Sequence, residues 1–143
     1  PKSHVAYGFA THVVLLDEEG RVAEVWAAHD SGRVVNPTSI QGQIEGGVLM
    51  GLGYALTEDF PLKDCVPTAK YGTLGLLRAD QIPDIHAIYV EKSERLPFAY
   101  GAKGIGEIAT IPTAPAAQNA YYARDHKLRA SLPMEDTFYK KKK

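Results

Sequence analysis

The chain contains the sequence NPTSIQGQIEGGVLMGLGYAL at residues 36–56, and this stretch predicts the long helix of the fold. Asn36 suits the N-cap, because its side-chain oxygen can accept a hydrogen bond from a backbone N–H of the first turn. Pro37 suits the first helical position, where a backbone N–H would have no partner within the helix. Apolar side chains then recur at every fourth position, which predicts one apolar stripe along about five turns. They are Ile40, Ile44, Val48, Leu52 and Leu56.

The same helix is rich in glycine, which is a poor helix former. Each glycine in a helix interior costs up to about 1 kcal/mol relative to alanine, so the surroundings must compensate. Close approach of a cofactor or of another backbone to the glycine face would do so, and a buried interface is the simpler explanation. The glycines concerned are Gly42, Gly46, Gly47, Gly51 and Gly53.

Two strands are predicted before this helix. Residues 5–16 are rich in Val, Tyr, Phe, Thr and Leu, and residues 17–20 (DEEG) supply a short acidic turn. Val22, Val25 and Trp26 follow the turn. This pattern is typical of a β-hairpin.

A third strand is predicted after the helix. Residues 59–69 have the composition of an irregular connection, and residues 70–82 that of a loop with room for one short strand. Residues 85–91 alternate between apolar and polar side chains, which indicates a strand that residues 95–97 (RLP) end.

A second helix is predicted near the C-terminus. It begins between Pro112 and Ala116 and runs to about Arg124, with prolines tolerated in its first turn. After residues 130–133 (ASLP) we expect an extended, polar segment. The order β-β-α-β-α predicts a two-layer α+β domain, with both helices on one face of a mixed sheet.

The sequence YGAKGIGEIATIP at residues 100–112 places one carboxylate, Glu107, after a glycine-rich loop. Glycines permit positive φ angles and leave no Cβ to hold a ligand away. Their free N–H groups can face an anion or an oxygen-rich cofactor. The side chains after Glu107 are mostly apolar, and loss of water raises the pKa of a carboxylic acid. Glu107 is therefore a candidate general base. The alternative is that it caps the following helix or pairs with Lys103.

Bulk composition indicates one ordinary domain. The chain has 143 residues, of which 45% are hydrophobic and 23% charged, as in soluble globular proteins. A net charge of −1 argues against a nucleic-acid partner, which normally requires a basic surface. No apolar run approaches the roughly 20 residues of a membrane span, and the N-terminus lacks a signal-peptide pattern. We therefore expect a cytoplasmic protein without a membrane partner.

Several kinds of site are excluded or disfavoured. A single cysteine, Cys65, excludes an internal disulfide and any multi-cysteine cluster, and we interpret it as structural. The histidines are scattered without ligand spacing, so each is expected to be an ordinary surface or core residue. The sequence contains no dinucleotide fingerprint, P-loop or nucleophile elbow. The scattered histidines are His4, His12, His29, His86 and His126.

Two of these stretches together resemble one known family, the xanthine oxidase family of molybdenum hydroxylases. Residues 41–47 (QGQIEGG) and 51–53 (GLG) are similar to its glycine-rich helix, and residues 104–107 (GIGE) resemble its catalytic-glutamate loop. The two stretches lie in the family's order and at about its separation. Residues 129–134 (RASLPM) also resemble a segment near the family's C-terminus.

The resemblance implies a role for several residues. Glu107 matches the family's general base, and Gln43 matches a glutamine that hydrogen-bonds the molybdopterin cofactor. The backbone of Gly104, Ile105 and Gly106 matches the segment that passes beside the metal. No protein ligand to the metal is expected. By the same resemblance, residues 1–139 are the C-terminal molybdopterin-binding domain, and residues 140–143 are a solvated basic tail.

The implied reaction is hydroxylation of an electron-poor carbon of a purine, another N-heterocycle or an aldehyde, with oxygen from water. The expected cofactors are molybdopterin, with a cytosine dinucleotide form as one option, and [2Fe–2S] and FAD on partner domains or subunits. The upstream molybdopterin-binding region would complete the pocket, so the chain alone is expected to be inactive. Ile108-Ala109 after the glutamate differ from the paired prolines of animal xanthine enzymes, which leaves the substrate open. The alternative is a non-catalytic structural or assembly module that packs against a partner subunit.

Overall fold

The fold is built on a small mixed sheet, described by a computed structural model for residues 7–91 and 99–140. Strand β1 (Ala10–Leu16) pairs antiparallel with β2 (Val22–Asp30), which confirms the predicted hairpin. Strand β5 (Asp84–Val90) pairs parallel with β2, so the strand order is β1-β2-β5. Parallel strands need a crossover connection, and helix α1 (Pro37–Leu56) supplies it.

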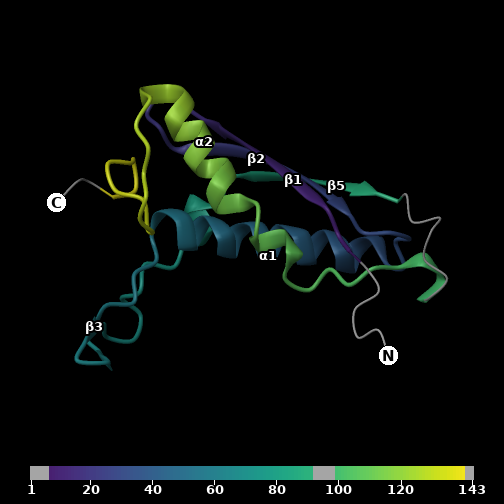
Figure 1. Cartoon of the computed structure of the whole chain (residues 1–143), viewed down its shortest axis with the longest axis horizontal. Coiled ribbons are helices and arrows are strands. Elements are labelled where there is room, and N and C mark those ends of the chain that lie inside the picture. Colours follow the sequence, from purple (N-terminus) through teal and green to yellow (C-terminus); the bar gives the residue numbers. More distant parts are fainter. Residues whose placement is uncertain (1–6, 92–98, 141–143) are drawn as a thin grey trace.

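Both helices lie over one face of this sheet, as Figure 1 shows for α1 and α2 (Thr113–Asp125). The inward side chains of β1 and β2 join the core under them, Val14 at 6% exposure and Val25 at 0%. The opposite face has no such cover among the described residues, and Trp26 is 41% exposed there. The structure therefore confirms the two-layer α+β fold with the order β-β-α-β-α.

Helix α1 begins and packs as its sequence predicts. The Asn36 side-chain oxygen accepts a hydrogen bond from the Ser39 N–H at 3.0 Å, and Pro37 is the first helical residue. All five members of the apolar stripe are buried, with exposures of at most 8%. Burial of this stripe offsets the low helix propensity of the glycines, because a buried aliphatic side chain contributes about 1.5–3 kcal/mol.

Helix α2 is tied to the turn of the hairpin. The Tyr121 hydroxyl donates to the carbonyl oxygen of Gly20 at 2.6 Å, and Gly20 has a φ of +89° that favours glycine. Arg124 donates to the carbonyl oxygens of Asp17 and Glu18. These bonds fix one end of α2, and therefore the helix as a whole, against the strands.

The connection after α1 differs from the prediction. Residues 59–69 contain two very short strands, β3 (Leu62–Lys63) and β4 (Val66–Pro67), which form a hairpin that projects beyond the end of α1 (Figure 1). Asp64 and Cys65 form its turn with φ values of 51° and 63°. Cys65 is exposed in this turn, and its interpretation as a structural residue stays a prediction.

The loop that follows also differs in detail. Residues 70–82 contain no strand, and a short 3₁₀ helix at Ala79–Gln81 precedes β5 instead. Strand β5 ends at Val90, and residues 95–97, which were predicted to end it, lie outside the described residues.

The C-terminal segment packs against the end of α1 and is less polar in its contacts than predicted. Met134 is 1% exposed, and its N–H donates to the carbonyl oxygen of Ala55 at 2.7 Å. Arg129 pairs with Asp125 at 2.6 Å and holds the pKa of that carboxyl group near 2 through the hydrogen bond between them. Lys140, predicted to begin a solvated tail, pairs with Asp59 at 3.5 Å.

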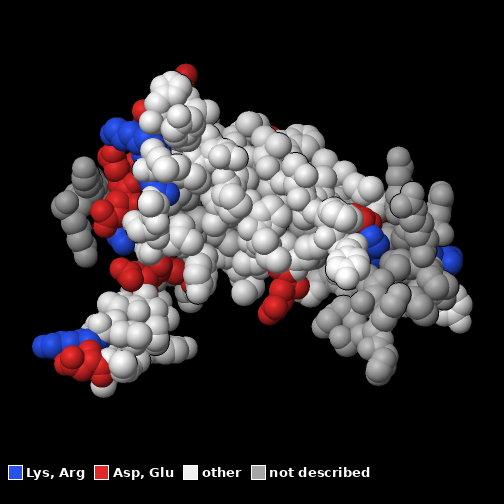
Figure 2. All heavy atoms as spheres, in the orientation of Figure 1, with Lys and Arg blue, Asp and Glu red and all other residues white. Residues whose placement is uncertain are grey.

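Charge is distributed unevenly over the surface. Figure 2 shows that charged side chains gather at the end of the molecule that carries the C-terminal segment, while the middle of this face is almost uncharged. Within the part of the chain that the structure describes, no helix has the length and hydropathy to cross a membrane.

Candidate active site

The glycine-rich loop is held along the end of β2. Gly32 and Ala102 form an isolated antiparallel bridge, and the Arg33 N–H donates to the Gly101 carbonyl oxygen at 2.9 Å. The Lys103 N–H donates to the Ser31 carbonyl oxygen at 3.1 Å. Gly101 has a φ of +84°, a conformation that favours glycine and lets the chain turn into this position.

A partly buried ion pair reinforces the same attachment. The Lys103 ammonium contacts the Asp30 carboxylate and donates to the Tyr7 carbonyl oxygen at 2.8 Å. The two paired side chains are only 9% and 16% exposed. The alternative in which Lys103 pairs with Glu107 is therefore not what the structure has.

The two stretches singled out in the sequence meet at one hydrogen bond. Gln43, on α1, donates from Nε2 to the carbonyl oxygen of Gly106 at 2.5 Å, across 63 positions of sequence. This bond joins the glycine-rich helix to the loop immediately before Glu107. The predicted cofactor ligand Gln43 thus also fixes the loop that carries the predicted base.

A hollow of about 650 Å³ opens where these stretches meet. Its volume falls in the range of small-molecule sites, about 300–1,000 Å³. Glycines, one amide and one carboxylate line it, together with a few apolar side chains. The lining residues are Gly42, Gln43, Gly46, Gly47, Met50, Gly106, Glu107, Thr110 and Ile111.

The glycines of α1 divide into two kinds. A Cβ added at Gly42 or Gly46 would meet no atom within 4 Å, so these two positions border open space. A Cβ added at Gly47 would lie 2.6 Å from that of Ala109, and one at Gly51 would lie equally close to Thr113. Close packing therefore accounts for Gly47 and Gly51, and also for Gly53, where an added Cβ would press on the Glu58 side chain. Room for a ligand accounts for Gly42 and Gly46.

Glu107 lies at the rim of the hollow, immediately before the 3₁₀ turn at Ile108–Thr110. It makes no side-chain capping bond to this turn, which removes the capping alternative. Glu107 is exposed, so the predicted desolvation is wrong for the described residues taken alone. The apolar side chains that were expected to cover Glu107 make other contacts: Ala109 is buried beneath the turn, and Ile108 packs against Gly8.

The remaining predicted site residues lie beside the same loop. Gly104 and Gly106 are exposed, and a Cβ on either would meet no atom within 4 Å. Ile105 packs against the edge of the core and lines a neighbouring hollow of about 330 Å³, which Gly106 and Gln43 also border. Gln43 and Gly106 therefore line both of two neighbouring depressions.

A buried histidine pair behind the site was missed by sequence reasoning. His12 and His29 lie 2.7 Å apart between their Nε2 atoms, and His12 Nδ1 lies 3.1 Å from the Thr113 hydroxyl. Burial, and then the neighbouring His29, lower the pKa of His12 to about 4, and burial also lowers the pKa of His29. The sequence did carry a signal for this pair, because each histidine stands two positions from an inward-facing apolar residue of its strand. His12 precedes Val14 in β1, and His29 follows Ala27 in β2.

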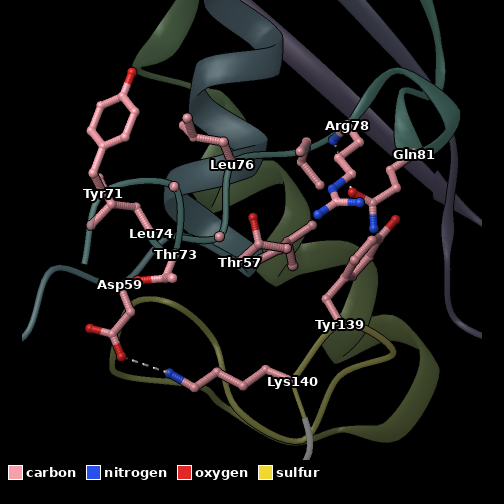
Figure 3. Close-up of a pocket in the computed structure, with 14 residues that line it drawn as sticks. Thr57, Asp59, Tyr71, Thr73, Leu74, Leu76, Arg78, Gln81, Tyr139 and Lys140 are labelled. Carbon is pink, nitrogen blue, oxygen red and sulfur yellow. Dashed lines mark hydrogen bonds and ion pairs between the residues drawn. The ribbon is translucent and has the colours of Figure 1, made fainter. Parts of the chain in front are cut away.

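A second depression lies at the far end of α1, away from every predicted site residue. It measures about 790 Å³ between residues 71–78 and the C-terminal segment. Figure 3 shows Arg78 and Gln81 near Tyr139, and Lys140 paired with Asp59. No residue of the glycine-rich loop lines this second depression. We therefore take the 650 Å³ hollow as the candidate site.

Comparison with known proteins places this geometry in one family. The family described as molybdopterin cofactor-binding domain matches residues 1–83. The isoquinoline 1-oxidoreductase subunit beta of Brevundimonas diminuta is 30% identical over 133 residues, which are 92% of this chain and 16% of that subunit. The xanthine dehydrogenase molybdenum-binding subunit of Escherichia coli O157:H7 is 36% identical over 95 residues, 64% of this chain and 12% of that subunit.

Solved structures agree with this assignment. Quinoline 2-oxidoreductase from Pseudomonas putida 86 superposes with a TM-score of 0.67 at 28% identity, covering 79% of this chain and 15% of that one. The chain therefore spans 12% to 16% of the length of these relatives, several of which are named as subunits. The family match includes Gln43 and ends before Glu107. The chain belongs to the molybdopterin cofactor-binding domain of the large subunits of the xanthine dehydrogenase and aldehyde oxidoreductase family, of which it represents one part.

Proposed function

We propose that this chain supplies the general base and one wall of the cofactor pocket of a molybdenum hydroxylase. The observation that carries this proposal is the hydrogen bond between Gln43 and the Gly106 carbonyl oxygen. It brings the glycine face of α1 and the carboxylate of Glu107 to the same 650 Å³ hollow. Open glycines give a flat cofactor access to the helix backbone, and the neighbouring carboxylate can act as a general base.

The residues present fit a large pterin cofactor. Gly42 and Gly46 leave open space against the helix backbone, so a flat ring system can approach it closely. The Gln43 side chain offers both a donor and an acceptor, which suits the polar edge of a pterin. When bound, the molybdenum cofactor supplies the two-electron redox chemistry and activates the oxygen that comes from water.

The role proposed for Glu107 is proton transfer. Its carboxylate accepts the proton of the water-derived hydroxyl group as the oxygen bonds to the substrate carbon, an effect worth roughly 10²–10⁴ in rate. The C–H bond of that carbon breaks in the same step, and the bound cofactor would be the oxidant that takes up the hydride with its two electrons. Exposure of Glu107 in the described chain means that the walls excluding water must come from elsewhere in the assembly. The upstream molybdopterin-binding region is the proposed source of these walls.

The proposed substrate is a purine or another N-heterocycle, with an aldehyde as the other option. Support comes from the names of relatives, which include an isoquinoline 1-oxidoreductase and a quinoline 2-oxidoreductase. Electrons from the substrate would leave through [2Fe–2S] centres and FAD on partner domains or subunits. We propose a cytoplasmic location for this assembly.

The test is Glu107→Gln in the complete, cofactor-loaded assembly. We expect turnover to fall by about 10²–10⁴, with molybdenum content near that of the wild type, because glutamine keeps the shape but cannot accept the proton. Glu19→Gln is the matched control, since Glu19 is an exposed carboxylate in the hairpin turn, and it should keep full activity. Normal turnover by the Glu107 variant would refute the proposed role.

The competing function is a non-catalytic assembly module, in which the hollow receives a partner protein. Met50 and Ile111, at 64% and 72% exposure, give that reading its support, because they form an apolar rim. Gly42→Val would separate the two functions in the complete subunit. A cofactor pocket predicts loss of pterin with subunit assembly intact, whereas a protein interface predicts failure of assembly.

A further inference from the structure

Four groups form a continuous chain of contacts in the core behind the candidate site. His29 Nε2 lies 2.7 Å from His12 Nε2, and His12 Nδ1 lies 3.1 Å from the Thr113 hydroxyl oxygen. The Thr113 hydroxyl in turn donates to the Ala109 carbonyl oxygen at 3.3 Å. His29 and Thr113 have no exposed surface, and His12 is 8% exposed. The chain therefore runs through the core from the middle strand to the turn after Glu107.

The chemistry of these groups gives the chain one direction. A carbonyl oxygen can only accept, so the Thr113 hydroxyl donates to Ala109 and accepts from the Nδ1–H of His12. A neutral imidazole carries one N–H, so His12 Nε2 must accept from the Nε2–H of His29. His29 Nδ1 is then a bare lone pair. It is the histidine atom that lacks a partner among the described residues, as this assignment requires.

The end of the chain lies in the turn that follows the proposed base. Ala109 is two residues after Glu107, and its carbonyl oxygen receives the last hydrogen bond. Gly47 leaves no room between α1 and Ala109, and Gly51 leaves none beside Thr113. The turn is thus pressed against the helix and cannot move toward it.

A second anchor lies on the other side of the base. Gln43 holds the carbonyl oxygen of Gly106, which immediately precedes Glu107. The carbonyl oxygen directly before Glu107, on Gly106, and the one two residues after it, on Ala109, are therefore both fixed by side chains from other elements. Two such anchors restrict the backbone of residues 107–109, which lies between them, and hence the direction of the Glu107 carboxylate.

We propose that His29, His12 and Thr113 are positioning residues that orient Glu107 by fixing the carbonyl oxygen of Ala109. The proposal rests on the proposed function only where it concerns activity, because the orientation itself can be measured separately. The buried histidines do not touch the hollow and act only through Thr113. Their role is to hold the Glu107 carboxylate in one direction before a substrate binds. A catalytic group that is already oriented need not lose that freedom during the reaction.

The test compares Thr113→Val with Thr113→Ser in the complete, cofactor-loaded enzyme. Valine keeps the shape of threonine but removes the hydroxyl, whereas serine keeps it. The first readout is amide hydrogen exchange of residues 107–111, followed by mass spectrometry. The Thr110 and Ile111 N–H groups bond to Glu107 and Ile108 within this turn, so its loosening would expose them.

We expect exchange in this segment to rise about tenfold in Thr113→Val, the factor that one lost hydrogen bond produces. We expect kcat to fall by at least the same factor, with KM and molybdenum content nearly unchanged, and serine to restore both readouts. Wild-type exchange and wild-type kcat in the valine variant would overturn the proposal. So would a loss of molybdenum that fully accounts for the lost activity.

A second pair of variants covers the case in which valine prevents assembly. His12→Gln keeps a donor and an acceptor in the chain, whereas His12→Leu removes both. Exchange of residues 107–111 should rise more in the leucine variant, and equal exchange in the two would overturn the proposal. If Glu107→Gln stays active while exchange still responds to Thr113, the base assignment fails and the positioning chain stands.

Discussion

The Lys103 ammonium and the Asp30 carboxylate form an ion pair that attaches the glycine-rich loop to the end of β2. Asp30 is the last residue of the strand, directly after the buried His29. Strand β2 therefore makes two attachments to this region. Asp30 holds the loop before Glu107, and His29 begins the chain of contacts that reaches the turn after Glu107. Both attachments act on a loop with few side chains of its own.

Lys103→Gln tests the first attachment. A buried ion pair that loses one partner leaves an uncompensated charge, which costs about 3–5 kcal/mol. We expect the urea midpoint of the chain to fall accordingly, with the larger loss in the Lys103 variant than in a Lys103→Met/Asp30→Leu double variant. Lys127→Gln is the control, because its pair with Asp136 is exposed and should leave the midpoint unchanged. An equal midpoint for Lys103→Gln and wild type would contradict the prediction.

Gly47→Ala and Gly42→Ala are expected to act in opposite directions on stability. Alanine at position 47 would press its Cβ on Ala109, and overpacking of this kind costs about 1–3 kcal/mol. Alanine at position 42 meets nothing and should stabilise the helix by up to about 1 kcal/mol. Denaturant unfolding of the two variants measures this contrast. Destabilisation by both would show that the space beside Gly42 is not open.

The long helix could be predicted because its signals are local. Asn36 caps it, and the spacing of its apolar side chains requires no knowledge of distant residues. The β3-β4 hairpin could not be predicted in this way, since each strand has two residues and its turn places Asp64 and Cys65 at positive φ, which those residues seldom adopt. Local preference was overridden there by the geometry of a tight turn.

The proximity of the two glycine-rich stretches could be predicted from the sequence, whereas the solvent exposure of Glu107 could not. Gln43 and Glu107 meet at one hollow, as their shared family resemblance implied. Glu107 is exposed because neighbouring residues in sequence pack elsewhere, and neighbours in sequence alone do not show which way their side chains point. The histidine pair depends on the register of β1 and β2, which sets His12 and His29 on the inner face of the sheet.

That pair also predicts a specific loss of stability in acid. The pKa of His12 is lowered by burial from 6.5 to about 4, so between these values the unfolded chain binds more protons than the folded one. Stability is therefore complete above about pH 6.5 and falls as the pH drops toward 4, by on the order of 3 kcal/mol. His29, whose pKa burial also lowers, acts in the same direction.

His12→Gln should flatten this dependence, because glutamine does not titrate in that range and still offers a donor and an acceptor. The measurement is the urea midpoint at pH 7 and at pH 4.5, compared between variant and wild type. His86→Gln, on the exposed face of the sheet, serves as the matched histidine control and should keep the wild-type slope. A wild-type slope in the His12 variant would mean that other groups cause the acid sensitivity. The reason to expect otherwise is that His12 can take up a proton only at Nε2, the atom that accepts the hydrogen bond from His29 Nε2 at 2.7 Å.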